Sequence, residues 1–299
     1  MNDNEYRRHH YIPQFILKNF YNRNVEGIEY YDLKTKCINI TNTREIFMDI
    51  DLYRDIINSD SPVKIEKDFS KYESEVSMII KKLLIGTEVT LTIKEYESLM
   101  LFLGLLGLRS VNVRDAYEKM KNESNLFSNY QKDMDYVDFW KRNLGYLVNC
   151  RSIEEVLINE KIDEPIKVFA MRDVFGIKGK YLILLERRGQ EDFLIGDCYP
   201  CVMTGDIMNL HLYDFFPISS ERIIILASRG VEASIPSVRI FDKSNLKEPT
   251  MNGDNVIIKV KKIYQNEVKY INQETVSNCK IGVAFKDKKN ISILPIKHT

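Results

Sequence analysis

The sequence predicts an α+β protein in which a helical N-terminal half packs on a mainly antiparallel β-sheet C-terminal half. Helical periodicity dominates residues 1–160, apart from a small hairpin near 28–41. Short runs rich in Ile, Val and Phe dominate residues 165–245, and a helix is expected at 260–280. No internal repeat or low-complexity linker divides the chain, and 44% of its 299 residues are hydrophobic. We therefore expect a single integrated domain over residues 1–299.

The first elements are short. Pro13 suits the first turn of a helix, so a short helix is predicted at about 13–21. The runs "IEYYDL" and "CINIT" are β-rich and are joined by the polar "KTK", which predicts the hairpin near 28–41. A second short helix is expected near 43–48.

Residues 61–86 give the clearest helix signal, with a Ser-Pro start and a stop at Gly86. Apolar side chains recur there at steps of three and four. They form one stripe, made of Ile65, Phe69, Tyr72, Val76, Ile79 and Leu83. Glu66 and Glu73 are seven residues apart and lie one above the other at the edge of this stripe. An edge position allows a carboxylate to be half-buried.

A second helix is predicted at 92–110, where Thr92 and Glu95 match the capping-box pattern. From Leu99 to Leu108 it is apolar on every face, so it should be central to the core. Arg109 closes this helix. Its guanidinium could interact with the helix C-terminus and one carboxylate, or it could clamp a phosphate or carboxylate ligand. Both alternatives stay open, and polar helical segments follow to about residue 160.

The C-terminal half contains short apolar runs separated by turn residues, and short links favour antiparallel pairing. They are "IKVFAMRD", "KYLILLERR", "EDFLIGD", "RIIILAS" and "SVRIF". Asp197 follows one of these strands. At a strand end it could face a cleft, or it could form an Asx-turn in which the side chain caps its own backbone. Cys198 and Cys201 have C-x-x-C spacing, but no second C-x-x-C exists to complete a zinc site, so we expect packing roles.

The bulk composition and the absence of known motifs limit the classes of function that the sequence favours. Lys+Arg and Asp+Glu are both 43, so wholesale attraction to nucleic acid is not indicated, although a local basic patch is compatible with it. The apolar stretch at residues 99–108 is too short to span a bilayer, and the first twenty residues lack the apolar core of a signal peptide. The sequence therefore predicts a cytoplasmic, non-membrane protein with reduced thiols. No dinucleotide fingerprint, Walker A run, G-x-S-x-G elbow or His-Glu-x-x-His is present.

"RRHHYIPQF", residues 7–15, contains two of the four histidines. Histidine titrates near neutral pH and is the commonest metal ligand. A His-His pair followed by Pro resembles the opening of some HNH-type nucleases, in which one histidine binds metal and its neighbour activates water. Those enzymes need a further His or Asn soon after, but the next histidine is His211. The alternative is that His9 and His10 pin the N-terminal segment to the core.

Several of these stretches, in order, resemble a mostly bacterial family of uncharacterised proteins that opens with a His-His-Tyr-Ile/Val-Pro-Gln-Phe motif. The carrying segments are "HHYIPQFILKNF", "IEYYDLKTK", "IEKDFSKYE", "LMLFLGLLGLR", "IGDCYP", "FFPISSERIIIL" and "YINQETVSNC". The "IGDCYP" turn departs from the family's Ser-Asp-Asn-Pro type. Because the segments run end to end, the resemblance implies one integrated domain.

The resemblance also singles out a set of polar residues: His10, Gln14, Glu66, Glu73, Arg109 and Asp197. The resemblance does not supply an activity, but a set containing His, two Glu, Arg and Asp predicts a metal-dependent phosphodiesterase or nuclease-like enzyme that acts on nucleic acid in a cleft between the two halves. The kind of protein that this chain resembles suggests a bacterial defence or toxin setting. His10 would be a ligand or general base, the acidic residues would hold Mg²⁺ or Mn²⁺, and Arg109 would stabilise phosphate charge. Gln14 belongs to the same catalytic group. The alternative is a non-catalytic binding or sensor module, with nucleic acid or another protein as partner, in which these residues form a structural network.

Overall fold

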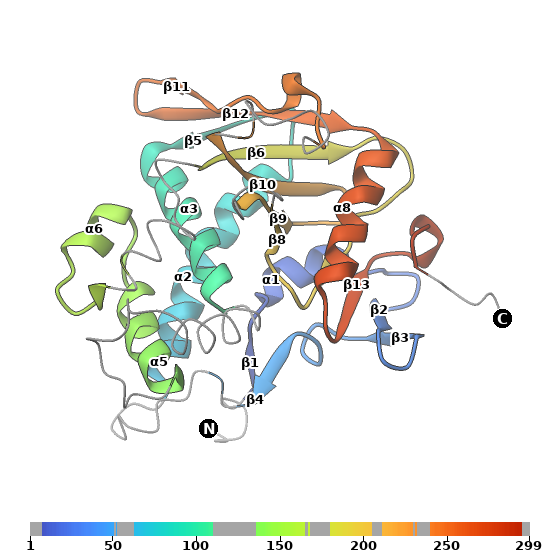
Figure 1. The fold of residues 1–299 in the computed structure, drawn as a ribbon, viewed down its shortest axis with the longest axis horizontal. Coiled ribbons are helices and arrows are strands. Elements are labelled where there is room, and N and C mark those ends of the chain that lie inside the picture. The colour runs from blue at the N-terminus through green and yellow to red at the C-terminus, as the bar shows by residue number, and fades with distance from the viewer. Residues whose placement is uncertain are drawn as a thin grey trace.

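In this computed structural model the chain forms an α+β fold with three sheets among the residues that the structure describes (Figure 1). The described residues are 8–50, 52, 63–109, 136–164, 167, 180–204, 211–229, 231 and 240–294, with the backbone alone at 136–141, 204 and 211. No helix in these ranges is long and apolar enough to cross a membrane.

The N-terminal segment forms small elements that lie against one another. Strand β1 (Arg8–His10) pairs with β4 (Met48–Ile50) in a two-stranded sheet. Helix α1 (Gln14–Leu17) and the 3₁₀ turn η2 (Lys18–Phe20) occupy the predicted 13–21 helix. The predicted hairpin is confirmed as β2 (Ile28–Asp32) and β3 (Cys37–Thr41). The helix expected near 43–48 is wrong, because a turn there leads into β4.

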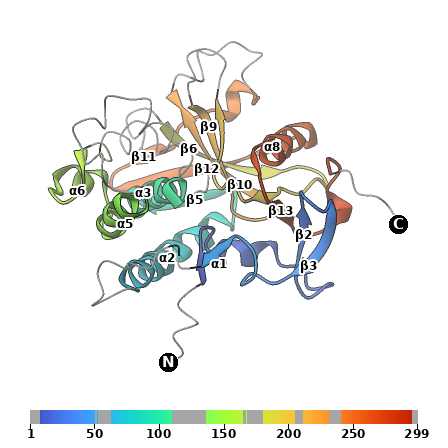
Figure 2. The same ribbon diagram turned by 60° about the horizontal axis from the view of Figure 1, so that its bottom comes forward.

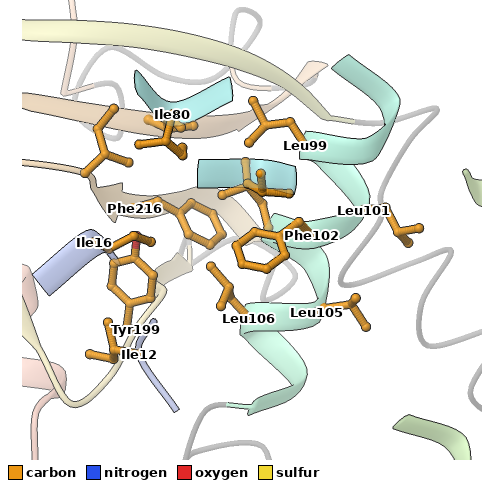
Figure 3. Close-up of a cluster of buried hydrophobic side chains, with 14 of the residues drawn as sticks. Ile12, Ile16, Ile80, Leu99, Leu101, Phe102, Leu105, Leu106, Tyr199 and Phe216 are labelled. Atoms are coloured by element: carbon orange, nitrogen blue, oxygen red, sulfur yellow. The ribbon is translucent and has the colours of Figure 1, made fainter. Parts of the chain in front are cut away.

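Two long helices pack beside each other behind the largest sheet. Helix α2 (Lys64–Leu83) buries the stripe predicted from its spacing. Helix α3 (Ile93–Arg109) begins with the predicted capping box: Thr92 N donates to Glu95 Oε2 at 3.0 Å, and Glu95 N donates to Thr92 Oγ1 at 3.2 Å. Its apolar stretch is buried as expected (Figure 3). Helices α5 (Tyr136–Leu147) and α6 (Ile153–Ile158) follow.

The largest sheet has seven strands in the order β11-β12-β6-β10-β9-β8, with β5 also paired to β12. These strands are β5 (Glu88–Thr92), β6 (Lys180–Arg187), β8 (Cys201–Thr204), β9 (His211–Pro217), β10 (Arg222–Ser228), β11 (Thr250–Asn252) and β12 (Asn255–Ile263). Pairing is antiparallel except between β12 and β6, which run parallel. The strands expected at 166–173 and 237–241 lie almost wholly outside the described residues.

Both faces of this sheet are covered, which explains why β6 and β10 read as continuous apolar runs. Leu182 and Leu184 join the core with α2 and α3, whereas Ile183 and Leu185 face the core formed with α8 (Gln265–Asn278). Figure 2 shows α2 on one side of the sheet and α8 on the other. The predicted C-terminal helix at 260–280 is confirmed as α8.

The expected division into a helical N-terminal half and a β-sheet C-terminal half is wrong. The N-terminal β5 pairs with β12, and a four-stranded sheet joins β3 and β2 to β13 (Gly282–Phe285) and β7 (Ile195–Gly196). The helices are scattered along the chain, and α8 is C-terminal. Strands β5 and β13 are only a few residues long and pair with strands distant in sequence, so local periodicity did not reveal them. Whether the chain folds as a single domain stays a prediction.

Candidate functional site

Five of the six polar residues singled out by the sequence gather around the C-terminal end of α3. The cluster draws on β1 for His10, α1 for Gln14, α2 for Glu66 and Glu73, and α3 for Arg109. All of these elements belong to the first 109 residues. The expected cleft between an N-terminal and a C-terminal half is therefore not where these residues meet. We call this group the Arg109 cluster.

Arg109 links the elements of the cluster. Its side chain is buried, with 4% of the residue exposed. Nη1 donates to Glu73 Oε1 at 2.7 Å, and Nη2 donates to the backbone carbonyl of His10. The guanidinium carbon lies 4.2 Å from the centre of the Phe69 ring, a cation–π contact. A buried guanidinium needs such partners because an unpaired buried charge is costly, so Arg109 fixes the His-His segment to both long helices.

Glu66 is the perturbed acid of the cluster. Burial raises its pKa to about 7, the nearby Glu73 carboxylate adds to the rise, and the positive charge of Arg109 opposes it. Its Oε2 is buried and has no hydrogen-bond partner among the described residues. Glu66 therefore holds a carboxyl oxygen ready for a proton or a cation.

The pKa of His10 is shifted in the opposite direction. Burial and the positive charge of Arg109 lower its pKa to about 4, against the effect of backbone hydrogen bonds with Thr43 and Arg44. Its Nδ1 lies 3.3 Å from Gln14 Nε2, within hydrogen-bond distance. His10 is thus neutral near pH 7. Residue type alone predicts that histidine titrates closest to neutrality, but in this fold it is Glu66 that does so.

Asp197, the sixth residue, does not join the cluster. It is buried after β7, and its carboxylate accepts three backbone hydrogen bonds at the start of β13. Lys280 N donates to Oδ2 at 3.0 Å, while Ile281 N and Gly282 N donate to Oδ1 at 3.2 and 3.1 Å. The Asp197 carboxylate therefore caps backbone groups, but those of residues 280–282 and not those of its own turn, which an Asx-turn would require. The charge of Asp197 also adds to the burial that raises the pKa of Tyr11.

The described residues do not gather three His, Cys, Asp or Glu side chains in a geometry that could hold a metal ion. They do place Glu66 and Glu73 close enough to repel electrostatically. Magnesium commonly takes only one or two carboxylates and completes its shell with water and substrate phosphate. A cation at this cluster would have at most these two carboxylates as protein ligands among the described acidic residues.

Sequence reasoning missed two features of the folded chain. Phe69 was recognised only as a stripe residue, although it carries the Arg109 contact. The second feature is a polar cavity of about 120 Å³, whose lining includes Arg187, Asp192 and Lys286. Asp192 Oδ1 is 3.1 Å from Arg187 Nη2. No motif marks this cavity, because its walls come from segments that meet only in the folded chain.

Comparison with known proteins gives one result at the family level. No curated protein and no solved structure shows a significant match to this chain. The family model of DUF4238, described as a protein of unknown function, matches residues 8–289. That span includes the His-His motif and the five residues of the Arg109 cluster. The chain therefore belongs to the DUF4238 family of proteins of unknown function.

Proposed function

We propose that this protein is a divalent-metal-dependent phosphodiesterase acting on nucleic acid, with the ion held by Glu66 and Glu73. The observation that carries the proposal is the unpaired, buried Oε2 of Glu66 beside a second carboxylate. Two neighbouring carboxylates repel when both are ionised, and a divalent cation relieves that repulsion.

The remaining residues would organise this site. A bound Mg²⁺ or Mn²⁺ would polarise the phosphoryl oxygen and lower the pKa of a bound water. Arg109 acts as a positioning residue, because it contacts Glu73, His10 and Phe69, and its charge biases the site toward anions. The role of His10 as a ligand or general base stays a prediction; its ring is neutral near pH 7, and its Nδ1 lies within hydrogen-bond distance of Gln14 Nε2. A bacterial defence or toxin setting stays a prediction.

The test pairs metal binding with cleavage. Mn²⁺ is titrated by calorimetry into wild type, Glu66→Gln and Glu73→Gln, and single- and double-stranded DNA and RNA are assayed with Mg²⁺, Mn²⁺ or EDTA. We expect wild type to bind Mn²⁺ and cleave, and Glu66→Gln to lose at least about tenfold in metal affinity, because losing even a residue that supports a metal ligand typically costs that much.

Glu75→Gln is the matched control. Glu75 lies on the same helix, is exposed and pairs with Arg151 at 2.7 Å, so its replacement removes an Arg–Glu pair outside the cluster. It should leave Mn²⁺ affinity and cleavage unchanged. Absence of Mn²⁺ binding by folded wild type would overturn the metal site.

A second candidate is a non-catalytic binding module. It is favoured by Arg109, which is 4% exposed and already bonded to Glu73 and His10, so that little of its guanidinium faces solvent. This candidate predicts nucleic-acid or protein binding without cleavage under any metal condition. Glu66→Gln would then change stability but not cleavage.

A further inference from the structure

Three of the five cysteines meet where helix α8 ends against the turn that joins β7 to β8. Cys198 follows β7, Cys201 begins β8, and Cys279 is the C-cap of α8. Cys198 Sγ lies 3.3 Å from Cys279 Sγ and also donates to the Thr275 carbonyl at 3.5 Å. All five thiols are free in this structure.

The backbones that carry these two thiols are already fixed together. Asp197 N donates to the Gly282 carbonyl at 3.2 Å, and the Asp197 carboxylate accepts the backbone N–H groups of residues 280–282. Gly196 leaves the space that Cys279 occupies, since a Cβ there would come within 2.2 Å of Cys279 Sγ. The thiols can therefore close on each other by side-chain rotation while the junction stays intact.

The sulfurs of Cys198 and Cys279 differ in their exposure to solvent. Cys198 is 2% exposed and Cys201 is 3% exposed, whereas Cys279 is half-buried. An oxidant from solvent thus reaches Cys279 first, and the sheltered Cys198 is the sulfur in contact with it. Hydrogen bonds with Cys201 and Cys279, together with burial, raise the pKa of Cys198, which keeps it a protonated thiol until its neighbour is activated.

We propose that Cys279 and Cys198 form a peroxide-responsive dithiol, with Cys279 the attacked sulfur and Cys198 the resolving sulfur. The Cys279 thiolate attacks a peroxide oxygen, the O–O bond breaks, and Cys279 becomes a sulfenic acid; the other oxygen leaves as hydroxide and takes up the proton that the thiol released, which gives the first water. Cys198 then attacks the Cys279 sulfur, an S–S bond forms, and the sulfenic oxygen leaves as water with the Cys198 proton. Two thiols are oxidised and one hydrogen peroxide is reduced to two waters.

The test uses the full-length chain. Reduced protein is treated with hydrogen peroxide, the remaining thiols are alkylated, and the digest is mapped by mass spectrometry before and after dithiothreitol. We expect two of the five thiols to disappear, a Cys198–Cys279 peptide pair that dithiothreitol separates, and a higher melting temperature for the oxidised protein, because the link closes a long loop.

Variants decide the assignment. Cys279→Ser should abolish the intramolecular link, whereas Cys201→Ser should retain it, and the exposed Cys37 on β3 supplies the matched control Cys37→Ser. A Cys198–Cys201 link in wild type, or Cys279 oxidised to sulfinic acid while Cys198 stays free, would overturn the proposal. These readouts in wild type stand even if one variant fails to fold.

Discussion

Two buried arginines in this molecule are used in different ways. Arg222 on β10 donates Nε to Glu186 Oε2 at 2.9 Å, and Nη1 to the Leu83 carbonyl at 2.8 Å. Its Nη2 donates to the Gly86 carbonyl at 2.6 Å. Burial alone would raise the pKa of Glu186, but hydrogen bonds from Arg222 and Lys262 lower it. Arg222 thus donates hydrogen bonds both to backbone carbonyls at the end of α2 and to the ionised carboxylate of Glu186.

Arg109 is also bonded to a carboxylate and a carbonyl, yet a second acid remains beside it with a raised pKa and an unpaired oxygen. Perturbed titratable groups tend to occur at functional sites, whereas satisfied ion pairs support structure. The comparison teaches that the presence of a buried arginine does not identify a site. The unsatisfied acid beside Arg109 is what makes its cluster a candidate site.

The largest effect should come from breaking the satisfied network. Arg222→Met leaves the carbonyls of Leu83 and Gly86 without these donors and removes the closest partner of Glu186. Removing one member of a buried ion pair typically costs about 3–5 kcal/mol of unfolding free energy. Urea denaturation measures this loss, while NMR should show the Glu66 pKa unchanged. A loss below about 1 kcal/mol would mean that Arg222 is not structural.

The second prediction concerns the pH dependence contributed by Glu66. Its folded pKa is about 7, above the ordinary value of 4.5, so its protonated form favours folding fully below pH 4.5. That contribution is lost as the pH rises through 7. Glu66→Gln, which stays neutral, should match wild type near pH 4 and exceed its unfolding free energy by about 2 kcal/mol at pH 8, after allowing for partial solvent screening.

Urea midpoints at the two pH values measure this difference. Glu73→Gln is the control, because it removes the partner of Arg109 and should destabilise the protein at both pH values. A Glu66→Gln variant that is less stable than wild type at pH 8 would show that Glu66 is ionised and paired there.

Asp197→Asn tests whether Asp197 is separate from the Arg109 cluster. An amide accepts hydrogen bonds less strongly than a carboxylate, and its NH₂ would face the backbone donors of residues 280–282. We expect a loss of about 1–2 kcal/mol in thermal or urea unfolding. Mn²⁺ affinity should not change. A large fall in Mn²⁺ affinity would instead place Asp197 in the metal site.

The smallest effect should come from Thr92→Ala, which removes the hydroxyl that accepts from Glu95 N. Loss of an N-cap side chain costs about 1 kcal/mol. Because α3 ends at Arg109, circular dichroism and the Glu66 pKa should report whether fraying at its first turn reaches the cluster. We expect the pKa to stay unchanged, and a shift would show that the site depends on the whole helix.

The sequence by itself determined the local features of this protein. The α2 stripe, the Thr92–Glu95 capping box, the hairpin near 28–41 and the C-terminal helix all follow from spacings within a few turns of chain. The seven-residue separation of Glu66 and Glu73 already placed both carboxylates on one helix edge. These predictions succeeded because helix and hairpin geometry is set by near neighbours.

The tertiary structure decided the rest. Pairing of β5 with β12 and of β2 with β13 joins residues far apart in sequence, which overturned the two-half arrangement. Burial, which depends on the whole fold, moved the pKa of Glu66 up and that of His10 down. Long-range packing directed Asp197 to backbone amides and brought Cys198 to Cys279. Desolvation and strand pairing arise between distant segments, so no local pattern of residues encodes them.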